Sequence, residues 1–565
     1  MKRRGKMSGR TVNGTYPLYD LPRIRTLREL VEIKYRSCPE NIAFSYQNEA
    51  GGKVSKTFGD VYHDMNTLES WMSSQGVQNR HIALIGENSY PWLIAFLAVV
   101  DSGNVAVPIN RGLRGEEIAG LLQRADITMA FCSETCIGNL SGRGNVSGKG
   151  ILPGTEKIEF ISFDEVEKIC GVMENAGNCR ALYRDESDVA QKFDCVTGTI
   201  EVDADKCCCI FFTSGTSGAA KGVCLSQRNL ASEITQASRM VGLGGNTVSL
   251  LPFHHAFGLV AGILAAFHYG YEIYLNRSIK TVRQSLAEQK PQNLFLVPLY
   301  VETFHRQVWA AAKKHGRDRG LRWLMRVSDT LLKAGIDLRG KLFRSVREAF
   351  GGRLEYMICG GAALDPFYVR QFRSWGIEIL NGYGTTECSP CVAVNRNLCH
   401  KDGTVGLPLP DVEVKAAPDG EILIRGDVVM GGYYKDPEAT AAVLQGGWYA
   451  TGDLGYLDEE GFLTLTGRKK NLIILSNGEN VSPEELEAAF AREDGVREVL
   501  VYERERRIVA EIYPEENRMG DEVYFSKLLQ KVNQKFPAHK RVAKVILRGE
   551  EFAKNSSMKI VRYPV

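Results

Sequence analysis

Three segments of the chain share one alternating pattern, and this pattern limits the fold more than any other feature. In residues 81–110 an apolar run is followed by a polar turn, an apolar segment of helical length, a glycine and a second apolar run. Residues 248–275 and 355–384 repeat this order. Two parallel strands need a long crossover between them, and a helix is the usual crossover. The pattern therefore predicts an α/β fold, in which mainly parallel sheets are covered by helices.

The length and composition of the chain indicate a globular protein with several domains. Its 565 residues exceed what one hydrophobic core supports, and 44% hydrophobic and 24% charged residues are usual for a globular protein. The net charge of +3 gives no electrostatic signal for a nucleic-acid partner. The sequence contains no apolar run of about 18 residues that would span a bilayer, and its basic start lacks the apolar core of a signal peptide. Because 14 cysteines without a secretion signal favour a reducing compartment, we expect a cytoplasmic protein.

Changes of pattern along the chain predict its division into parts. Residues 1–24 are basic and predict a disordered or irregular tail. Residues 25–467 contain the three repeated segments, and short strands near their end predict a β-rich lobe. The stretch 468–471 predicts a linker, and residues 472–565 alternate helices and strands as a compact α+β domain does. Between about 140 and 200, Gly, Ser and acidic residues predict an insertion, and whether it is ordered stays open.

The stretch TSGTSGAAKG at residues 213–222 combines glycines, hydroxyl side chains and one lysine. Glycines let backbone N–H groups approach an anion, and Lys221 adds a positive charge, so the stretch predicts a phosphate-binding loop. It differs from the usual nucleotide P-loop, because Ala220 precedes the lysine and a strand rather than a helix is predicted next. A Ser/Gly surface turn would have the same composition, and the stretch alone does not decide between them. The loop residues are Thr213, Ser214, Gly215, Thr216, Ser217, Gly218 and Lys221.

Further stretches place polar residues at predicted turns, namely LPFHHAFG (251–258), ICGGAAL (358–364), NGYGTTECSP (381–390), WYATGDLG (448–455) and GRKKN (467–471). Each alone is more typical of a structural position than of a binding site, since glycine pairs and Asp form turns and a histidine at a strand end is commonly a core residue. Together they contain what an ATP site requires. Tyr383 offers a ring to stack on adenine, and Glu387 offers oxygen ligands to Mg²⁺. Asp453 can accept hydrogen bonds from ribose hydroxyls, and Arg468 adds a charged donor.

This ordered set of motifs resembles the adenylate-forming superfamily, which includes acyl-CoA synthetases, the adenylation domains of peptide synthetases and beetle luciferases. The resemblance runs from about residue 25 to about residue 560, nearly the whole chain. It implies a large N-terminal part with two doubly wound sheets and a distorted β-barrel, followed by a small mobile α+β domain. ATP, Mg²⁺ and coenzyme A are the implied substrates and cofactors.

The resemblance also assigns roles to individual residues. Lys559 matches the lysine that activates adenylation, His255 the histidine at the mouth of the acyl pocket, and Lys470 the hinge position. Thr386 and Glu387 match the residues that serve phosphate and Mg²⁺, and Thr216 is the second residue assigned to the metal. The other implied nucleotide-binding residues, besides the loop given above, are Gly360, Gly361, Ala362, Asn381, Tyr383, Gly384, Thr385, Asp453 and Arg468.

The sequence departs from the family pattern at Ala220, Cys359, Asn471, Asn477 and Met558, where Pro, Ser, Asp, Gly and Gly are common. None of these changes removes a catalytic charge. Of these departures, Asn477 is the one most relevant to binding of the thiol substrate, since the family's corresponding loop lies close to the tunnel of that substrate.

The expected reaction is the ATP-dependent activation of a carboxylic acid to an acyl-AMP, followed by transfer of the acyl group to the thiol of coenzyme A. One alternative is a ligase that loads a separate acyl carrier protein, and another is an enzyme for aryl or amino acids. Peptide-synthetase domains carry an Asp after the aromatic residue, whereas His254 and His255 follow Phe253 here. A non-catalytic adenylate-binding module is the third alternative, and the presence of Glu387 and Lys559 speaks against it. The exact acid and the thiol partner stay open.

The segment 305–347 predicts a contact with membrane. It carries twelve Lys and Arg residues against three Asp, an excess of nine positive charges. Its apolar residues recur at helical spacing, which is the composition of an interfacial helix. A solvated helix packed on the core, or a charge that steers phosphates, would explain the same pattern. Because an insertion of this kind is similar to that of long-chain fatty acyl-CoA synthetases, we expect a medium- to long-chain fatty acid as substrate, with the enzyme peripheral at the membrane. The apolar residues are Leu321, Leu324, Met325, Leu331 and Leu332.

Lys559 generates the first prediction. Lys559→Ala should lower acyl-adenylate formation by about a hundredfold or more, because a preorganised positive charge between the carboxylate and the α-phosphate is lost. Thioester formation from supplied acyl-AMP should change much less, and assays of the two half-reactions measure both effects. Equal losses in both would show that the lysine has a structural role.

Overall fold

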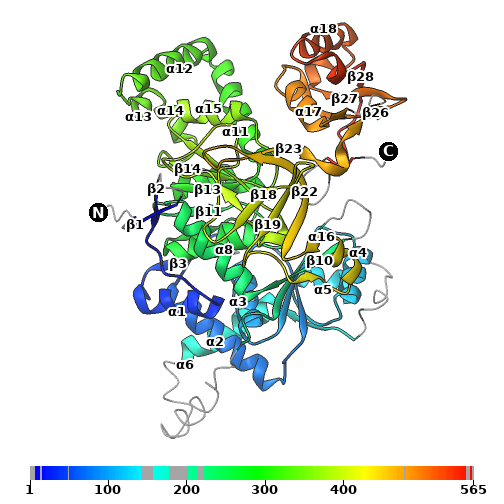
Figure 1. The fold of residues 1–565 in the computed structure, drawn as a ribbon. Coiled ribbons are helices and arrows are strands. Elements are labelled where there is room, and N and C mark those ends of the chain that lie inside the picture. The colour runs from blue at the N-terminus through cyan, green and yellow to red at the C-terminus, as the bar shows by residue number, and fades with distance from the viewer. Residues whose placement is uncertain are drawn as a thin grey trace, which may run out of the picture. The chain divides into compact units, whose positions relative to one another are not determined.

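The structure, a computed structural model, describes residues 7–12, 16–48, 50–141, 155, 157–176, 202–213, 220–475, 479–554 and 560–562. The chain forms two compact units, which can be followed by colour in Figure 1. The first unit consists of Met1–Asp402, Gly406–Val412 and Arg425–Leu444. The second unit consists of Gly403–Val405, Glu413–Ile424 and Gln445–Val565.

A seven-stranded sheet in the first unit has the order β20–β10–β9–β6–β5–β7–β8. Five of its strands run parallel, whereas β10 and β20 join one edge in antiparallel pairings. Helix α3 (Tyr90–Asp101) connects β5 to β6, and all of its residues are buried, as its continuous apolar sequence requires. The predicted strand–helix–strand unit in 81–110 is confirmed. The strands are β5 (His81–Ile85), β6 (Val105–Pro108), β7 (Ile127–Cys132), β8 (Glu159–Ser162), β9 (Cys207–Thr213), β10 (Lys221–Ser226) and β20 (Gly432–Tyr433).

A nine-stranded sheet completes the first unit, in the order β17–β16–β15–β14–β13–β11–β12–β3–β4. The six central strands, from β15 to β3, are parallel. The two other predicted units are confirmed, because β11 pairs with β12 and β14 pairs with β15 in parallel. The strands are β3 (Ile42–Gln47), β4 (Lys53–Thr57), β11 (Thr247–Ser249), β12 (Ile273–Leu275), β13 (Asn293–Leu296), β14 (Tyr356–Cys359), β15 (Glu378–Tyr383), β16 (Ala393–Val394) and β17 (Leu407–Pro408).

The crossovers of this sheet differ in their helices. Helix α15 (Pro366–Ser374) joins β14 to β15, and its N-cap is Asp365, whose carboxylate accepts the Phe367 N–H at 2.8 Å. The β11–β12 crossover instead contains η2 (Phe257–Leu264), a π-helix, followed by α9 (Ala265–Tyr269). A π-helix is rare and commonly lies at a functional site.

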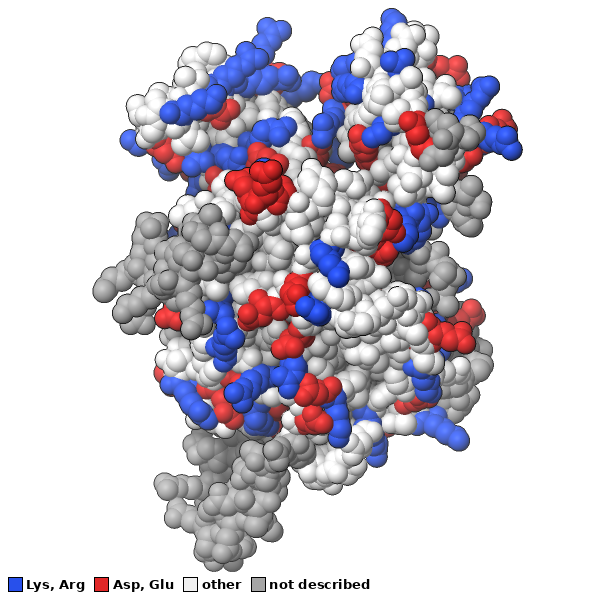
Figure 2. All heavy atoms as spheres, viewed as in Figure 1, with Lys and Arg blue, Asp and Glu red and all other residues white. Residues whose placement is uncertain are grey.

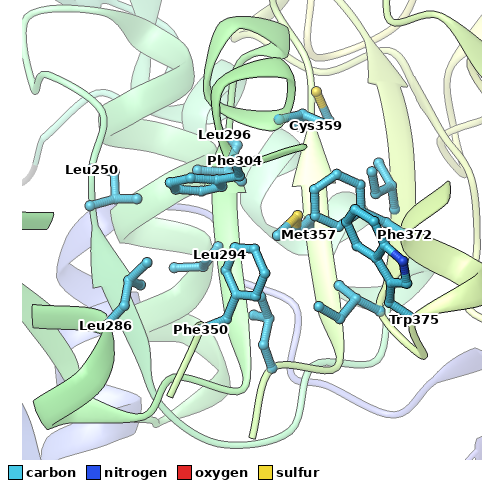
Figure 3. Close-up of a cluster of buried hydrophobic side chains, with 14 of the residues drawn as sticks. Leu250, Leu286, Leu294, Leu296, Phe304, Phe350, Met357, Cys359, Phe372 and Trp375 are labelled. Atoms are coloured by element: carbon cyan, nitrogen blue, oxygen red, sulfur yellow. The ribbon is translucent and has the colours of Figure 1, made fainter. Parts of the chain in front are cut away.

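A large apolar core lies on one side of the nine-stranded sheet. Figure 3 shows Leu294 and Leu296 of β13 and Met357 of β14 packed with Phe372 and Trp375. Both aromatic side chains are fully buried. Full burial of one Phe side chain stabilises the fold by about 1.5–3 kcal/mol.

Helices α11 (Pro298–Lys314) and α12 (Asp318–Lys333) pack against this core. The apolar stripe predicted in 305–347 is used for this packing, since Leu321 and Met325 are buried in the core cluster and Leu324 packs on it. These three residues therefore pack on the core and are not a surface that would face a membrane. None of the helices in the described ranges combines the length and apolar character that crossing a bilayer requires.

Two stretches for which the sequence predicted no helices or strands contain ordered elements. Within residues 1–24, β1 (Met7–Val12) and β2 (Tyr16–Tyr19) pair as antiparallel strands. Most of the predicted insertion at 140–200 lies outside the described residues. Its described part contains β8 and α6 (Phe163–Ala176), and β8 belongs to the seven-stranded sheet.

The second unit contains a five-stranded sheet and a separate α+β core. The five-stranded sheet has the order β18–β19–β22–β21, and β23 pairs with β22. It is the β-rich lobe expected from the sequence, and the distorted β-barrel stays a prediction. The α+β part has a three-stranded sheet, two helices and its own apolar core, so the predicted small C-terminal α+β fold is confirmed. The elements are β18 (Glu413–Ala416), β19 (Glu421–Arg425), β21 (Leu444–Gln445), β22 (Trp448–Leu457), β23 (Leu463–Arg468), α17 (Pro483–Ala491), β26 (Val496–Arg504), β27 (Arg507–Pro514), α18 (Glu522–Asn533) and β28 (Lys544–Leu547).

Candidate active site

The predicted phosphate loop connects two antiparallel strands. Thr213, the last residue of β9, lies opposite Lys221, the first residue of β10, and its hydroxyl contacts the Lys221 carbonyl oxygen at 3.4 Å. A strand rather than a helix thus follows the lysine, as the sequence predicts, and the loop has no helix N-terminus directly behind it. The structure fixes both ends of the loop. The predicted residues Ser214, Gly215, Thr216, Ser217 and Gly218 lie outside the described residues.

Glu387 lies on a short 3₁₀ turn, η4 (Thr386–Cys388), which follows β15. Its carboxylate oxygen Oε1 accepts a hydrogen bond from the Tyr433 hydroxyl at 2.9 Å. The Nζ atom of Lys221 lies 4.7 Å from the centre of the same tyrosine ring. One tyrosine therefore contacts both the predicted phosphate lysine and the predicted metal carboxylate. Sequence reasoning missed Tyr433, because a tyrosine beside a glycine carries no local signal of such a role.

The glycine turns after β14 and β15 lie at the carboxyl ends of parallel strands, where ligands of such sheets usually bind. Gly360 and Gly361 follow β14, and a Cβ atom at Gly360 would lie 3.2 Å from Cζ of Phe257. A Cβ atom at Gly384 would lie 1.7 Å from the Pro390 carbonyl oxygen, so only glycine fits there. Tyr383 ends β15 and is 8% exposed, which leaves a small part of its ring accessible.

The other predicted residues lie in or beside these two turns. Asn381 lies on β15 opposite Cys359, and its carbonyl oxygen accepts the Asn395 N–H at 2.9 Å. Thr385 and Thr386 connect β15 to Glu387. Ala362 continues the turn that Gly360 and Gly361 begin.

Two adjacent histidines precede the π-helix η2. The ring centres of His254 and His255 are 4.4 Å apart. The side chain of Asn88 holds this turn, since its amide donates to the Leu251 carbonyl oxygen at 2.7 Å and its oxygen accepts the Phe253 N–H at 3.0 Å. Because Phe257 also contacts Gly360, the structure brings the histidine turn next to the glycine turn. Asn88 is a further residue that sequence reasoning did not identify.

Burial makes His254 a neutral side chain. Desolvation, together with the neighbouring His255 and Arg111, lowers the pKa of His254 to about 3. A histidine that is neutral at physiological pH can accept or donate a hydrogen bond but adds no positive charge.

The second unit holds the predicted ribose residues. Asp453 on β22 lies directly opposite Arg468 on β23, and Arg468 Nε lies 2.7 Å from Asp453 Oδ1. The Asp453 side chain is 6% exposed and the Arg468 side chain 44% exposed, so the guanidinium is the accessible partner. Lys470 lies in the next turn, η5 (Lys469–Asn471). Lys559 lies outside the described residues.

The chemistry of the first unit suits a polyphosphate with a hard cation. Lys221 supplies a point charge for phosphate oxygens, and Glu387 supplies the oxygen ligand that Mg²⁺ prefers. The Glu387 side chain is partly exposed, so the carboxylate that Tyr433 orients is accessible to a bound ion. The residues present thus fit a magnesium–nucleotide complex.

Comparison with known proteins agrees with this geometry. Residues 31–434 match the model of the AMP-binding enzymes, and residues 470–565 match that of the AMP-binding enzyme C-terminal domain. The chain is 31% identical over 453 residues to the long-chain-fatty-acid–CoA ligase FadD15 of Mycobacterium bovis, covering 76% of this chain and 72% of that protein. It is 26% identical to long chain acyl-CoA synthetase 1 of Arabidopsis thaliana, covering 89% and 82%. The fold is similar to o-succinylbenzoate CoA synthetase of Bacillus subtilis in complex with its acyl-adenylate intermediate, with a TM-score of 0.71, 21% identity and coverage of 94% and 96%.

The depressed pKa of His254 predicts a pH-dependent stability. The histidine takes up a proton near pH 6.5 in the unfolded chain but only near pH 3 in the folded chain. Lowering the pH from about 7 to 4 should therefore favour unfolding, because only the unfolded state gains this proton. In His254→Asn the free energy of unfolding should fall less over this range than in the wild type. Denaturant titrations at each pH measure the difference.

An exposed histidine provides the control for this measurement. His315 lies at the end of α11 and is exposed, so His315→Asn should keep the wild-type dependence. Identical pH dependence in His254→Asn and the wild type would contradict the assignment of a neutral, desolvated His254.

Proposed function

The chain belongs to the AMP-binding enzyme family, and from this premise we propose that it ligates a fatty acid to coenzyme A through an acyl-adenylate intermediate. The observation that carries the proposal is that Tyr433 contacts both groups, Glu387 through its hydroxyl and Lys221 through its ring. A phosphate-binding cation and a metal-binding carboxylate are the two groups that a magnesium–ATP substrate needs most. The similarity to long-chain-fatty-acid–CoA ligases over most of the chain supports the fatty acid as the substrate class.

In the first half-reaction a carboxylate oxygen attacks the α-phosphorus of ATP, and pyrophosphate leaves. The protein forms no covalent bond, so positioning and charge neutralisation supply the catalysis. Lys221 and the loop residues 213–218 would hold the β- and γ-phosphates. Glu387, together with Thr216, would hold Mg²⁺, which when bound neutralises phosphate charge. Thr386 and the glycine turns of β14 and β15 would bind the phosphate and the adenosine.

In the second half-reaction the thiol of coenzyme A attacks the acyl carbonyl carbon, and AMP leaves. Asp453 and Arg468 would bind the ribose, with the buried carboxylate holding the guanidinium in place. Lys559 would serve only the adenylation step. A rotation at Lys470 would exchange the conformation used for adenylation for the one used for thioester formation. The α+β part of the second unit has its own core, so a change at a hinge would leave its fold intact.

His255 and the apolar residues of η2 would receive the acyl chain. Leu259, Val260 and Ile263 of η2 are buried, and Phe257 of the same helix contacts the glycine turn after β14. The residues of η2 are apolar and His254 is neutral, so this neighbourhood suits a hydrocarbon chain better than an ammonium group.

The test of the function is a substrate panel. Pyrophosphate exchange should be fastest with palmitate or a medium-chain acid and slow with acetate, benzoate and amino acids. The thioester should then form with coenzyme A. Preference for acetate, benzoate or an amino acid would contradict the fatty-acid proposal. If a thioester forms with an acyl carrier protein and not with coenzyme A, the carrier protein is the acceptor.

A second proposal concerns the membrane, and the exposed face of α12 supports it. Arg319, Arg322, Trp323, Arg326 and Lys333 are all exposed and recur at helical spacing. Trp323 is 63% exposed, which is unusual for so large an apolar side chain. Figure 2 shows Lys and Arg side chains gathered over α12 and its neighbours. A cationic face with a tryptophan suits the interface of an anionic bilayer, so α12 would lie on the membrane with this face while Leu321, Leu324 and Met325 pack on the core.

Reversing the charge of this face should remove membrane binding. Each basic residue near an anionic surface contributes about 1 kcal/mol, so Arg319→Glu/Arg322→Glu/Arg326→Glu should lower partitioning onto vesicles with anionic phospholipids by at least about a hundredfold. Thioester formation with a water-soluble acid should stay at the wild-type rate. Vesicle sedimentation at several salt concentrations measures the first effect.

A control variant reverses the same number of positive charges in the second unit. Lys527, Arg541 and Lys544 are exposed, and Lys527→Glu/Arg541→Glu/Lys544→Glu should keep the binding. Equal loss of vesicle binding in both variants would indicate attraction by net charge. If the α12 variant still binds vesicles, α12 only packs on the core and does not bind the membrane.

A further inference from the structure

The segment from Asp427 to Tyr433 links the Glu387 turn to strand β10. The Met430 N–H donates to the Glu387 carbonyl oxygen at 2.8 Å, and the Ser389 hydroxyl donates to the Val428 carbonyl oxygen at 2.8 Å. On its other side, the Gly431 N–H donates to the Cys224 carbonyl oxygen at 3.1 Å. The segment is thus hydrogen-bonded both to the turn with the predicted metal ligand and to the strand that begins with Lys221.

Tyr433 lies at the end of this segment, and both its backbone and its side chain make specific contacts. It pairs with Val223 of β10, and its N–H donates to the Thr440 hydroxyl at 2.9 Å. Tyr433 as a whole residue is 9% exposed. Its hydroxyl donates to Glu387 at 2.9 Å, and its ring face lies 4.7 Å from Nζ of Lys221.

The two contacts of the ring are chemically different. A hydroxyl that donates to a carboxylate fixes the rotamer of that carboxylate, because charge-assisted hydrogen bonds are strong and directional. An aromatic face attracts an ammonium group without a directional bond, so Lys221 stays near the ring but can still turn toward a phosphate. The metal-binding carboxylate is therefore held tightly and the phosphate-binding cation loosely.

We propose that Tyr433 is a positioning residue for the magnesium–ATP complex, which orients Glu387 toward Mg²⁺ through its hydroxyl and holds Lys221 beside the phosphates through its ring. The inference rests on the proposed function, since it assumes that Glu387 is the magnesium ligand. Residues that hydrogen-bond to a metal ligand raise metal affinity because they keep the ligand in its binding orientation. The hydroxyl should thus affect the magnesium requirement, and the ring should affect the nucleotide itself.

Two substitutions separate these roles. Tyr433→Phe removes the hydroxyl and keeps the ring, and it should raise the half-saturating Mg²⁺ concentration of pyrophosphate exchange by about tenfold. The thermal shift that ATP causes without Mg²⁺ should stay unchanged, whereas the shift at limiting Mg²⁺ should decrease. Tyr433→Leu removes both contacts and should also reduce the ATP shift without Mg²⁺. The melting temperature without ligand shows that each variant is folded.

The neighbouring Tyr434 supplies a matched control. Its hydroxyl donates to Asp126 rather than to Glu387, so Tyr434→Phe removes the same group one residue away. This variant should keep the wild-type magnesium requirement and both thermal shifts.

A folded Tyr433→Phe variant with the magnesium requirement of the wild type would overturn the inference, as would an equal change in Tyr434→Phe. Failure of the proposed function gives a different result. In that case the wild type catalyses no exchange with any acid, and the thermal shifts with ATP and Mg²⁺ still decide whether Tyr433 supports the binding of the complex.

Discussion

The pairing of strand β10 with β9 on one side and β20 on the other determines where the charged groups of the first unit lie. Lys221 stands opposite Thr213, and Val223 stands opposite Tyr433. Neighbouring residues of a strand point to opposite faces, so a slip of one residue would turn Tyr433 away from Glu387. The backbone groups of these strands are hydrogen-bonded to one another, and leaving them unpaired inside the protein would be costly. The phosphate loop, the tyrosine and the carboxylate therefore depend on one set of backbone hydrogen bonds.

Much of the fold could be predicted because local pattern and environment agree. Helix α3 is apolar on all sides and fully buried, and the short apolar runs around it became parallel strands. The C-terminal helices and strands also followed from their periodicity, as α17 (Pro483–Ala491) and β26 (Val496–Arg504) show. Glu387 lies just after β15, at the edge of the sheet where the glycine turns also lie.

The contacts that could not be predicted join residues far apart in sequence. The bond from Tyr433 to Glu387 depends on which strand β20 joins, and two residues in a glycine-rich turn give no sign of this choice. Asn88 holds the histidine turn across a much longer separation in sequence. In α12 the sequence pattern correctly predicts an apolar face, but periodicity does not identify what covers that face. The core residues of the nine-stranded sheet cover it, and this arrangement leaves the arginines and Trp323 on the outside.

The π-helix η2 has a consequence for how the substrate range of this enzyme could change during evolution. Its hydrogen bonds span one residue more than those of an α-helix, so the segment contains an extra residue relative to regular helical winding. Deleting one residue would restore that winding while the helix beyond the segment kept its orientation, so the change would fall on the side chains within the segment. Phe257, which lies against Gly360, and the apolar residues after it would then face different neighbours without a single change of side-chain type. Insertions and deletions in this segment are thus an economical genetic route to a differently shaped acyl site, and comparisons of related enzymes should consider the length of this helix as well as its composition.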